Sequence, residues 1–170
     1  AEPTLIIALD GWIDAGGAAD TAAEAMADQA GVATLASYST DELLDYRARR
    51  PTMHLLEGVI TDLEWPAIEL SGGTDAAGND VLFLTGAEPD RLWRTFVGAT
   101  VELALSFDVK RVIGLGAYPA PVPHTRSSRL STRSIALSAR VSSAVGANCG
   151  SASVRVSRSV DARVRASRVL

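Results

Sequence analysis

The pattern of apolar and polar positions at the start of the chain predicts a strand, a loop and a helix. Residues 4–9 are a short apolar run rich in β-branched side chains, which is typical of a buried strand. Residues 18–30 are rich in alanine with apolar positions four apart, and Gly31 follows as a helix stop. A second apolar run at residues 32–38 completes a βαβ unit. We therefore expect two parallel strands joined by a right-handed crossover.

The middle of the chain predicts a short helix, extended pieces and a hairpin. Residues 39–44 begin with Ser, Thr and Asp, which can cap a helix, and residues 45–60 are extended pieces interrupted by a proline and a glycine. Residues 67–70 and 81–85 are strand candidates separated by a turn rich in Gly, Asp and Asn. We expect this pair to form a hairpin at one edge of the sheet.

The next segment predicts an amphipathic helix followed by a buried strand. Apolar residues recur at spacings of three and four from Asp90, a candidate N-cap, to Asp108, where the helix should end. Residues 112–117 are a strand candidate, and residues 118–126 contain three prolines in five positions that fix an extended path. The elements together predict an α/β fold, a mostly parallel sheet flanked by helices in three layers.

Two loops of this fold offer polar side chains for a pocket. In open parallel sheets, ligands bind outside the carboxyl ends of the strands, and residues 10–17 and 118–126 follow two such ends. The first loop carries carboxylates, an indole and glycine amides at a helix N-terminus, and the second carries an imidazole and a guanidinium. The candidate pocket residues, for a ligand or a partner, are Asp10, Trp12, Asp14, Gly16, Arg50, Glu88, His124 and Arg126.

A structural role for the first loop stays open beside the functional one. Glycines at a strand-to-helix turn are often needed for backbone geometry alone, and Asp14 can simply cap the helix. The sequence contains no dinucleotide or P-loop fingerprint, no G-x-S-x-G elbow, and no H-E-x-x-H or calcium-loop motif. We therefore assign no catalytic residue and expect neither a cofactor nor a metal.

Composition divides the chain near residue 126. Residues 1–125 hold 7 Lys+Arg against 19 Asp+Glu and all the aromatic residues, whereas the remaining 45 hold nine Arg and one acid. Ser, Arg, Val and Ala supply 35 of those 45 residues, which makes the segment low-complexity sequence. We expect an α/β domain over residues 1–126 and, over residues 127–170, either a disordered extension or the out-of-frame reading of a GC-rich gene.

The charge and hydropathy of the chain limit the binding partners and the cellular location that we expect. The tail arginines can neutralise phosphates, but no aromatic residue there can stack a base, so nucleic acid is not an expected partner. The apolar runs are about a third of the roughly 20 residues that a membrane-spanning helix needs, and no signal-peptide pattern is present. The lone Cys149 has no disulfide partner. We expect a cytoplasmic protein.

Several short segments, read in order, resemble the proteasome assembly chaperone 2 family in its actinobacterial branch. They are L-D-G-W-I-D-A-G at 9–16, R-R-P-T at 49–52, E-W-P at 64–66, G-A-E-P-D-R-L-W-R-T-F at 86–96 and L-G-A-Y-P-A-P-V-P-H-T-R at 115–126. The resemblance spans residues 4–126. It implies an α/β sandwich related to nucleoside-phosphorylase and peptidyl-tRNA-hydrolase-like folds, a cytoplasmic protein and a homo-oligomer, but no known reaction.

Two functions follow from the resemblance and the loops. Eukaryotic relatives guide proteasome α subunits, so the first hypothesis is a non-catalytic assembly or interaction protein whose partner is a protein, with proteasome subunits as candidates. The alternative is a small-molecule enzyme, either an ATP-grasp-like carboxylate–amine ligase or a hydrolase-like protein. It would use Asp10 and Asp14 as acid/base groups or polar ligands, His124 as proton shuttle and Arg126 as anion clamp.

The resemblance also predicts a weakness in the fold. The family pattern continues beyond residue 126, whereas this chain turns into the Ser/Arg-rich segment. We therefore expect an incomplete sheet with exposed apolar faces, and a marginally stable or aggregation-prone polypeptide.

Overall fold

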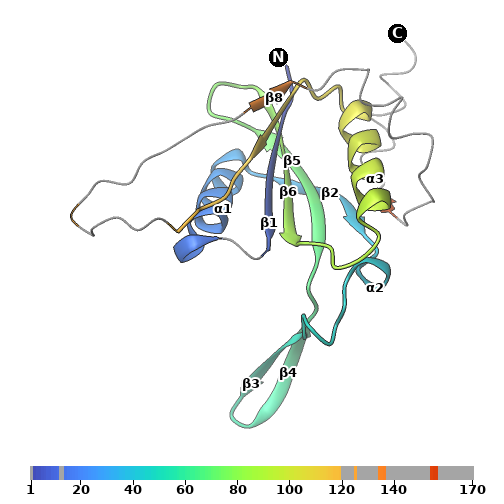
Figure 1. The fold of residues 1–170 in the computed structure, drawn as a ribbon. Helices are drawn as coiled ribbons and strands as arrows, with labels where there is room; N and C mark the ends of the chain where they lie inside the picture. The colour runs from blue at the N-terminus through green and yellow to red at the C-terminus, as the bar shows by residue number, and fades with distance from the viewer. Residues whose placement is uncertain (1, 12–13, 120–124, 126–133, 137–153, 157–170) are drawn as a thin grey trace.

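The structure is a computed structural model that describes residues 2–11, 14–119, 125, 134–136 and 154–156. A central sheet separates two helices, with α1 (Ala18–Ala30) against one face and α3 (Trp93–Ser106) against the other (Figure 1). This arrangement confirms the predicted α/β fold with flanking helices. In the described part of the chain, no helix combines the length and the apolar character needed to cross a membrane.

The sheet has seven strands in the order β8-β7-β1-β6-β5-β2-β9. Strand β1 pairs in parallel with β6 and β7, and β5 pairs antiparallel with β6 and β2, so β1, β2, β6 and β7 run in one direction. The main strands are β1 (Thr4–Asp10), β2 (Ala33–Tyr38), β5 (Ile68–Thr74), β6 (Asp80–Ala87) and β7 (Arg111–Gly114).

Strands β1 and β6 form the centre of the core because alternate residues fill both faces of the sheet. Leu5, Leu82 and Leu84 lie in the larger apolar cluster, where Phe96 of α3 packs. Ile6 and Phe83 lie in a second cluster, against which α1 packs. A strand buried on both faces reads as a continuous apolar run, which is the pattern seen in both segments.

Two predictions about the sheet need correction. The β5–β6 hairpin is confirmed, but its place at one edge is wrong, because β6 is the middle strand of the sheet and pairs with β1. The first two strands run in the same direction as expected, yet β6 and β5 lie between them. Antiparallel pairing of β2 with β5 produces this order.

The predicted boundaries of the third helix and last strand also change. Asp90 is not the N-cap of α3, since Leu92 occupies that position with a left-handed backbone (φ 53°). Strand β7 ends at Gly114 rather than at residue 117, and Ala117 takes part only in an isolated bridge to Asp14. The chain thus leaves the sheet earlier than its apolar run indicates.

A hairpin projects from the body of the molecule between α2 (Thr40–Leu43) and β5 (Figure 1). Its strands β3 (Thr52–Leu56) and β4 (Val59–Glu64) pair only with each other, and we call residues 52–64 the arm. Glu57 and Gly58 at its tip both have positive φ, as the central residues of a type I′ turn do. The sequence predicted only extended pieces here, whereas the short helix at residues 39–44 is confirmed as α2.

The Ser/Arg-rich segment contributes three-residue strands at both ends of the sheet. Strand β8 (Ser134–Ala136) pairs antiparallel with β7, and β9 (Val154–Val156) pairs antiparallel with β2. The other residues beyond 126 lie outside the described part of the chain. A domain that ends at residue 126 and an out-of-frame tail therefore remain predictions.

Candidate functional site

The loops that follow β1 and β7 lie side by side, as expected for strand ends at one edge of a sheet. Asp14 and Ala117 form an isolated parallel bridge, and the amide of Ala15 donates a hydrogen bond of 3.0 Å to the carbonyl of Ala117. Strand β1 therefore brings the first candidate loop next to the start of the second.

Asp14 caps the first turn of α1 with its side chain, from three residues before the N-cap position that Gly17 holds. Its carboxylate accepts hydrogen bonds of 3.0 and 3.1 Å from the amide of Ala19 and one of 3.2 Å from the amide of Asp20. Between Asp14 and the helix, η1 (Ala15–Gly17) turns through Gly16, whose φ of 74° suits a glycine. The geometry thus shows the structural roles that the sequence left open, helix capping for Asp14 and a backbone turn for Gly16.

A pocket of about 330 Å³ lies between the carboxyl-end halves of β1 and β6 and one side of α1, from Asp20 to Ala27. Its acidic lining consists of Asp10, Asp20 and Glu24. Burial, followed by the negative charges of Asp10, Asp14 and Glu24, raises the pKa of Asp20 above its usual value. Such a pocket repels anions, and no cluster in the described residues is suited to hold a metal ion.

The other predicted site residues are placed as follows. Glu88 lies against Gly11, where a β-carbon would come within 2.2 Å of Glu88 Oε2. Arg50 is exposed and makes no hydrogen bond or ion pair with a described residue, whereas its neighbour Arg49 contacts the end of β1. Trp12, His124 and Arg126 lie outside the described residues. Whether Asp10 and Asp14 converge with His124 and Arg126 remains untested.

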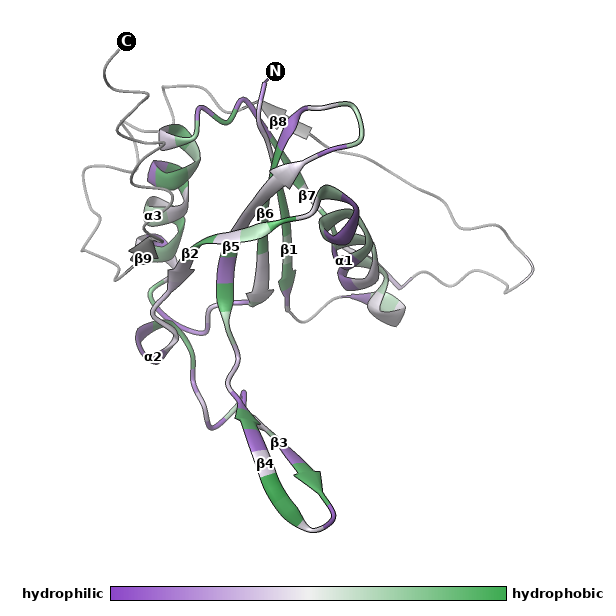
Figure 2. Cartoon of the chain, turned by 180° about the vertical axis from the view of Figure 1, so that it is seen from behind, coloured by the Kyte–Doolittle hydropathy of each residue, from purple (hydrophilic) through white to green (hydrophobic). Residues whose placement is uncertain are grey.

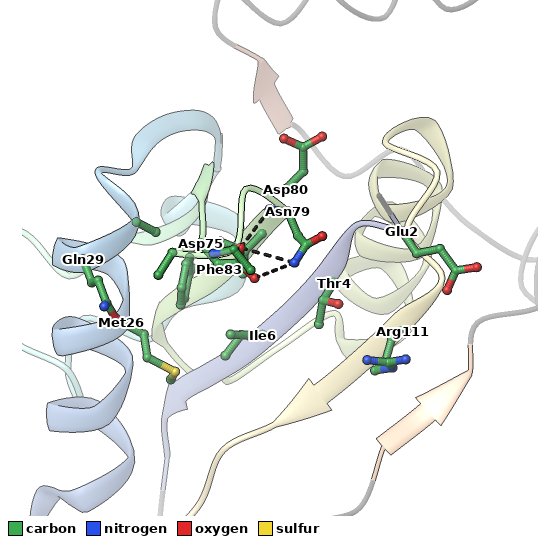
Figure 3. A pocket seen from close by; sticks show the side chains of 14 residues that line it. Glu2, Thr4, Ile6, Met26, Gln29, Asp75, Asn79, Asp80, Phe83 and Arg111 are labelled. Carbon is green, nitrogen blue, oxygen red and sulfur yellow. Dashed lines mark hydrogen bonds between the residues drawn. The ribbon is translucent and has the colours of Figure 1, made fainter.

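A cavity of about 670 Å³ lies at the opposite end of β1 (Figure 3). Ile6, Met26 and Phe83 supply apolar lining, and the turn between β5 and β6 lies beside them. Asp75 in this turn accepts hydrogen bonds from the amide and side chain of Asn79, which lower its pKa. The Asp75 carboxylate thus serves to stabilise the turn. None of the pocket residues predicted from the sequence lines this cavity.

The arm carries six of the exposed large apolar side chains of the described chain. Every residue of β3 and β4 is exposed, and Figure 2 shows hydrophobic colour along much of both strands. The large apolar side chains, 42% to 67% exposed, are Met53, Leu55, Leu56, Val59, Ile60 and Leu63.

Strand register divides the arm into two faces. Met53 pairs with Leu63 and Leu55 with Ile60, so these four side chains share one face, which we call the apolar face. The other face is polar near the body, where His54 Nε2 lies 3.2 Å from Glu64 Oε2. A shift in register between His54 and Leu55 keeps the apolar pairs together.

Comparison with known proteins gives a family and a fold. The family model described as PAC2 family matches residues 8–149. A Corynebacterium glutamicum protein of unknown function is 38% identical with a TM-score of 0.70, and the match covers 74% of this chain and 47% of that one. A Mycobacterium tuberculosis protein of unknown function is 40% identical with a TM-score of 0.67, covering 74% and 44%. No curated protein matches the chain.

A further match extends over nearly the whole chain. It is a Mycobacterium tuberculosis proteasome-assembly chaperone homologue, 24% identical with a TM-score of 0.68, covering 98% of this chain and 84% of that one. At this identity the match shows the fold alone. The chain spans about half the length of the two actinobacterial proteins that it resembles at 38% and 40% identity. With a family model matched over most of its length, the chain belongs to the PAC2 family.

Proposed function

We propose that the chain is a non-catalytic assembly or interaction protein that binds a protein partner through its arm. The observation that carries this proposal is the apolar face of a hairpin that projects from the body and packs on nothing else in the described structure. Exposed apolar patches of this kind mark protein interfaces. A two-stranded hairpin is also only marginally stable alone in water, so packing on a partner would stabilise it.

The expected binding energy favours more than one arm in the complex. Burying the exposed half of each of the four side chains on the apolar face contributes roughly 1 kcal/mol per residue. Association costs at least about 4 kcal/mol in lost translational and rotational freedom, which offsets that gain. A symmetric assembly in which two copies each contribute an arm doubles the buried area for a single association cost. A homo-oligomer is therefore part of the proposal.

Proteasome subunits are the proposed external partners of the assembly that the arms hold together, and the cytoplasm is the proposed location. The support is membership of the PAC2 family and likeness in fold to a protein whose name is proteasome-assembly chaperone homologue. No described feature favours the enzyme alternative, because Asp14 caps a helix and the pocket beside Asp10 is acidic. We therefore propose no second function.

Paired variants of the arm test the external partner. Leu55→Lys with Ile60→Lys charges the apolar face, whereas Thr52→Lys adds a charge to the polar face of the same strand. Each protein is passed over immobilised proteasome α subunits as the whole 170-residue chain, and binding is measured by interferometry. We expect the wild type and Thr52→Lys to bind, and the double variant to lose at least about tenfold in affinity, as expected for buried interface residues. Equal binding by all three proteins, or by none, overturns this assignment.

A further inference from the structure

The chain segment that leads into the arm is tied to the body by a dense set of hydrogen bonds. We call residues 43–50 the root. The carbonyl of Leu43 accepts hydrogen bonds of 2.9 and 3.0 Å from the amides of Asp90 and Arg91, and the Arg91 guanidinium donates one of 2.6 Å to the carbonyl of Leu44. Leu43 and Leu44 are themselves fully buried. The start of the root is therefore fixed to the loop between β6 and α3.

The chain segments before and after the arm also contact each other. Tyr46 in the root packs edge-on against Trp65, which directly follows the arm, with ring centroids 4.9 Å apart. The Tyr46 hydroxyl hydrogen-bonds at 2.9 Å to the side chains of Thr40 and Asp41 in α2. These contacts form a continuous physical connection between the arm and the root.

Arg49 joins the root to the end of β1. Its Nη1 donates a hydrogen bond of 3.1 Å to the carbonyl of Asp10, and its Nε lies 3.4 Å from Oδ1 of Asp90. The carbonyl of Asp10 accepts a second hydrogen bond, of 3.1 Å, from the amide of Glu88. Asp90 in turn accepts a hydrogen bond of 2.8 Å from the amide of Asp45. The guanidinium thus contacts two segments at once.

We propose that Arg49 couples the arm to the carboxyl end of β1, so that a partner bound to the arm stabilises the strand end beside the acidic pocket. The link to a partner rests on the proposed function, whereas the contact through Arg49 does not. A planar guanidinium presents separate donors to Asp10 and Asp90, which a single lysine ammonium cannot reproduce. Coupling of this kind is reciprocal, so a change at the strand end also alters partner affinity at the arm.

Two adjacent arginines provide the variant and its control. Arg49→Lys keeps the charge but removes the forked contact, and Arg50→Lys makes the same change at an exposed neighbour without a hydrogen bond to a described residue. Hydrogen exchange of the Glu88 and Ala15 amides is followed by NMR in both variants of the 170-residue chain. We expect exchange at these amides to accelerate about tenfold in Arg49→Lys alone, because local opening becomes easier. Amides in the middle of β5 should not change.

The arm variant separates the two proposals. In the protein with Leu55→Lys and Ile60→Lys, loss of the partner should accelerate exchange of the Glu88 amide. When Arg49→Lys is also present, exchange of this amide should no longer depend on whether the arm binds its partner. If Arg49→Lys exchanges like Arg50→Lys, the coupling is overturned whatever the arm binds. If Arg49→Lys accelerates exchange but the arm variant changes neither assembly nor exchange, the partner-dependent coupling fails together with the proposed function, and the local contact alone stands.

Discussion

The carbonyl oxygen of Ala67 occupies the space that a side chain at Gly86 would need. A β-carbon at position 86 would lie 2.0 Å from that oxygen, and Gly86 has a φ of 105°. The same stretch of β6 pairs with β1 on one side and β5 on the other. Close approach of the chain that returns from the arm to the central strand therefore depends on this glycine.

Gly86→Ala should destabilise the protein strongly. The new methyl group meets backbone that is fixed in the sheet, so we expect a loss of about 3 kcal/mol or more in the free energy of unfolding. Gly78→Ala is the matched control, because Gly78 has a φ of 82° but open space around it. That variant should lose only about 1 kcal/mol. Chemical denaturation measures both, and equal losses would contradict the steric explanation.

Asp14→Ala should remove the cap of α1. The amides of Ala19 and Asp20 lose their carboxylate acceptor, and we expect the free energy of unfolding to fall by about 1 kcal/mol. Asp28→Ala near the other end of the helix is the control, since an acidic residue there gains nothing from the helix dipole. The two variants are compared by thermal denaturation. A larger loss in Asp28→Ala would argue against the capping role.

The acidic pocket predicts a pH dependence. Burial and the neighbouring carboxylates raise the pKa of Asp20 in the folded protein, so the folded state binds this proton more tightly than the unfolded state. The contribution of Asp20 to stability therefore falls as pH rises from about 3.8 through the raised pKa. Asp20→Asn should gain melting temperature relative to wild type at pH 7 but not at pH 3.5. A constant difference across this range would show that the charge is not responsible.

Removing the arm should leave the body folded. Strands β3 and β4 form their own sheet, so a short Gly/Ser linker in place of residues 52–64 takes nothing from the central core. We expect a cooperative melt within a few degrees of the wild-type temperature, measured by circular dichroism, and less aggregation. If the shortened protein fails to fold, the arm contributes to the core in a way that the structure does not display.

The sequence predicts the central layers because local pattern and burial agree there. Both α1 and the strands β1 and β6 are apolar where the fold buries them, and Gly31 ends α1 as expected. Strand order follows from pairing between distant segments, which local pattern does not encode. The hairpin of β5 and β6 was therefore recognised but assigned to the edge. Asp90 looks like a helix cap, yet the root competes for its carboxylate through Asp45 and Arg49.

The candidate site was harder to predict. Asp14 satisfies both a capping and a binding interpretation, and only its distances to Ala19 and Asp20 distinguish them. Arg49 and Arg50 are equivalent in sequence, but only Arg49 reaches Asp10. The apolar residues of the arm resemble core strands, so their exposure could not be foreseen. The Glu-Gly pair at its tip was the one local signal for a hairpin turn.

The mass of the protein in solution tests the arm most directly. Light scattering after size exclusion is applied to the wild type, to the variant with Leu55→Lys and Ile60→Lys, and to Thr52→Lys. We predict an assembly larger than the 17.8 kDa chain for the wild type and Thr52→Lys, and a single chain for the double variant. A wild-type monomer, or the same mass for all three proteins, would contradict the assignment of the arm as the surface through which copies associate.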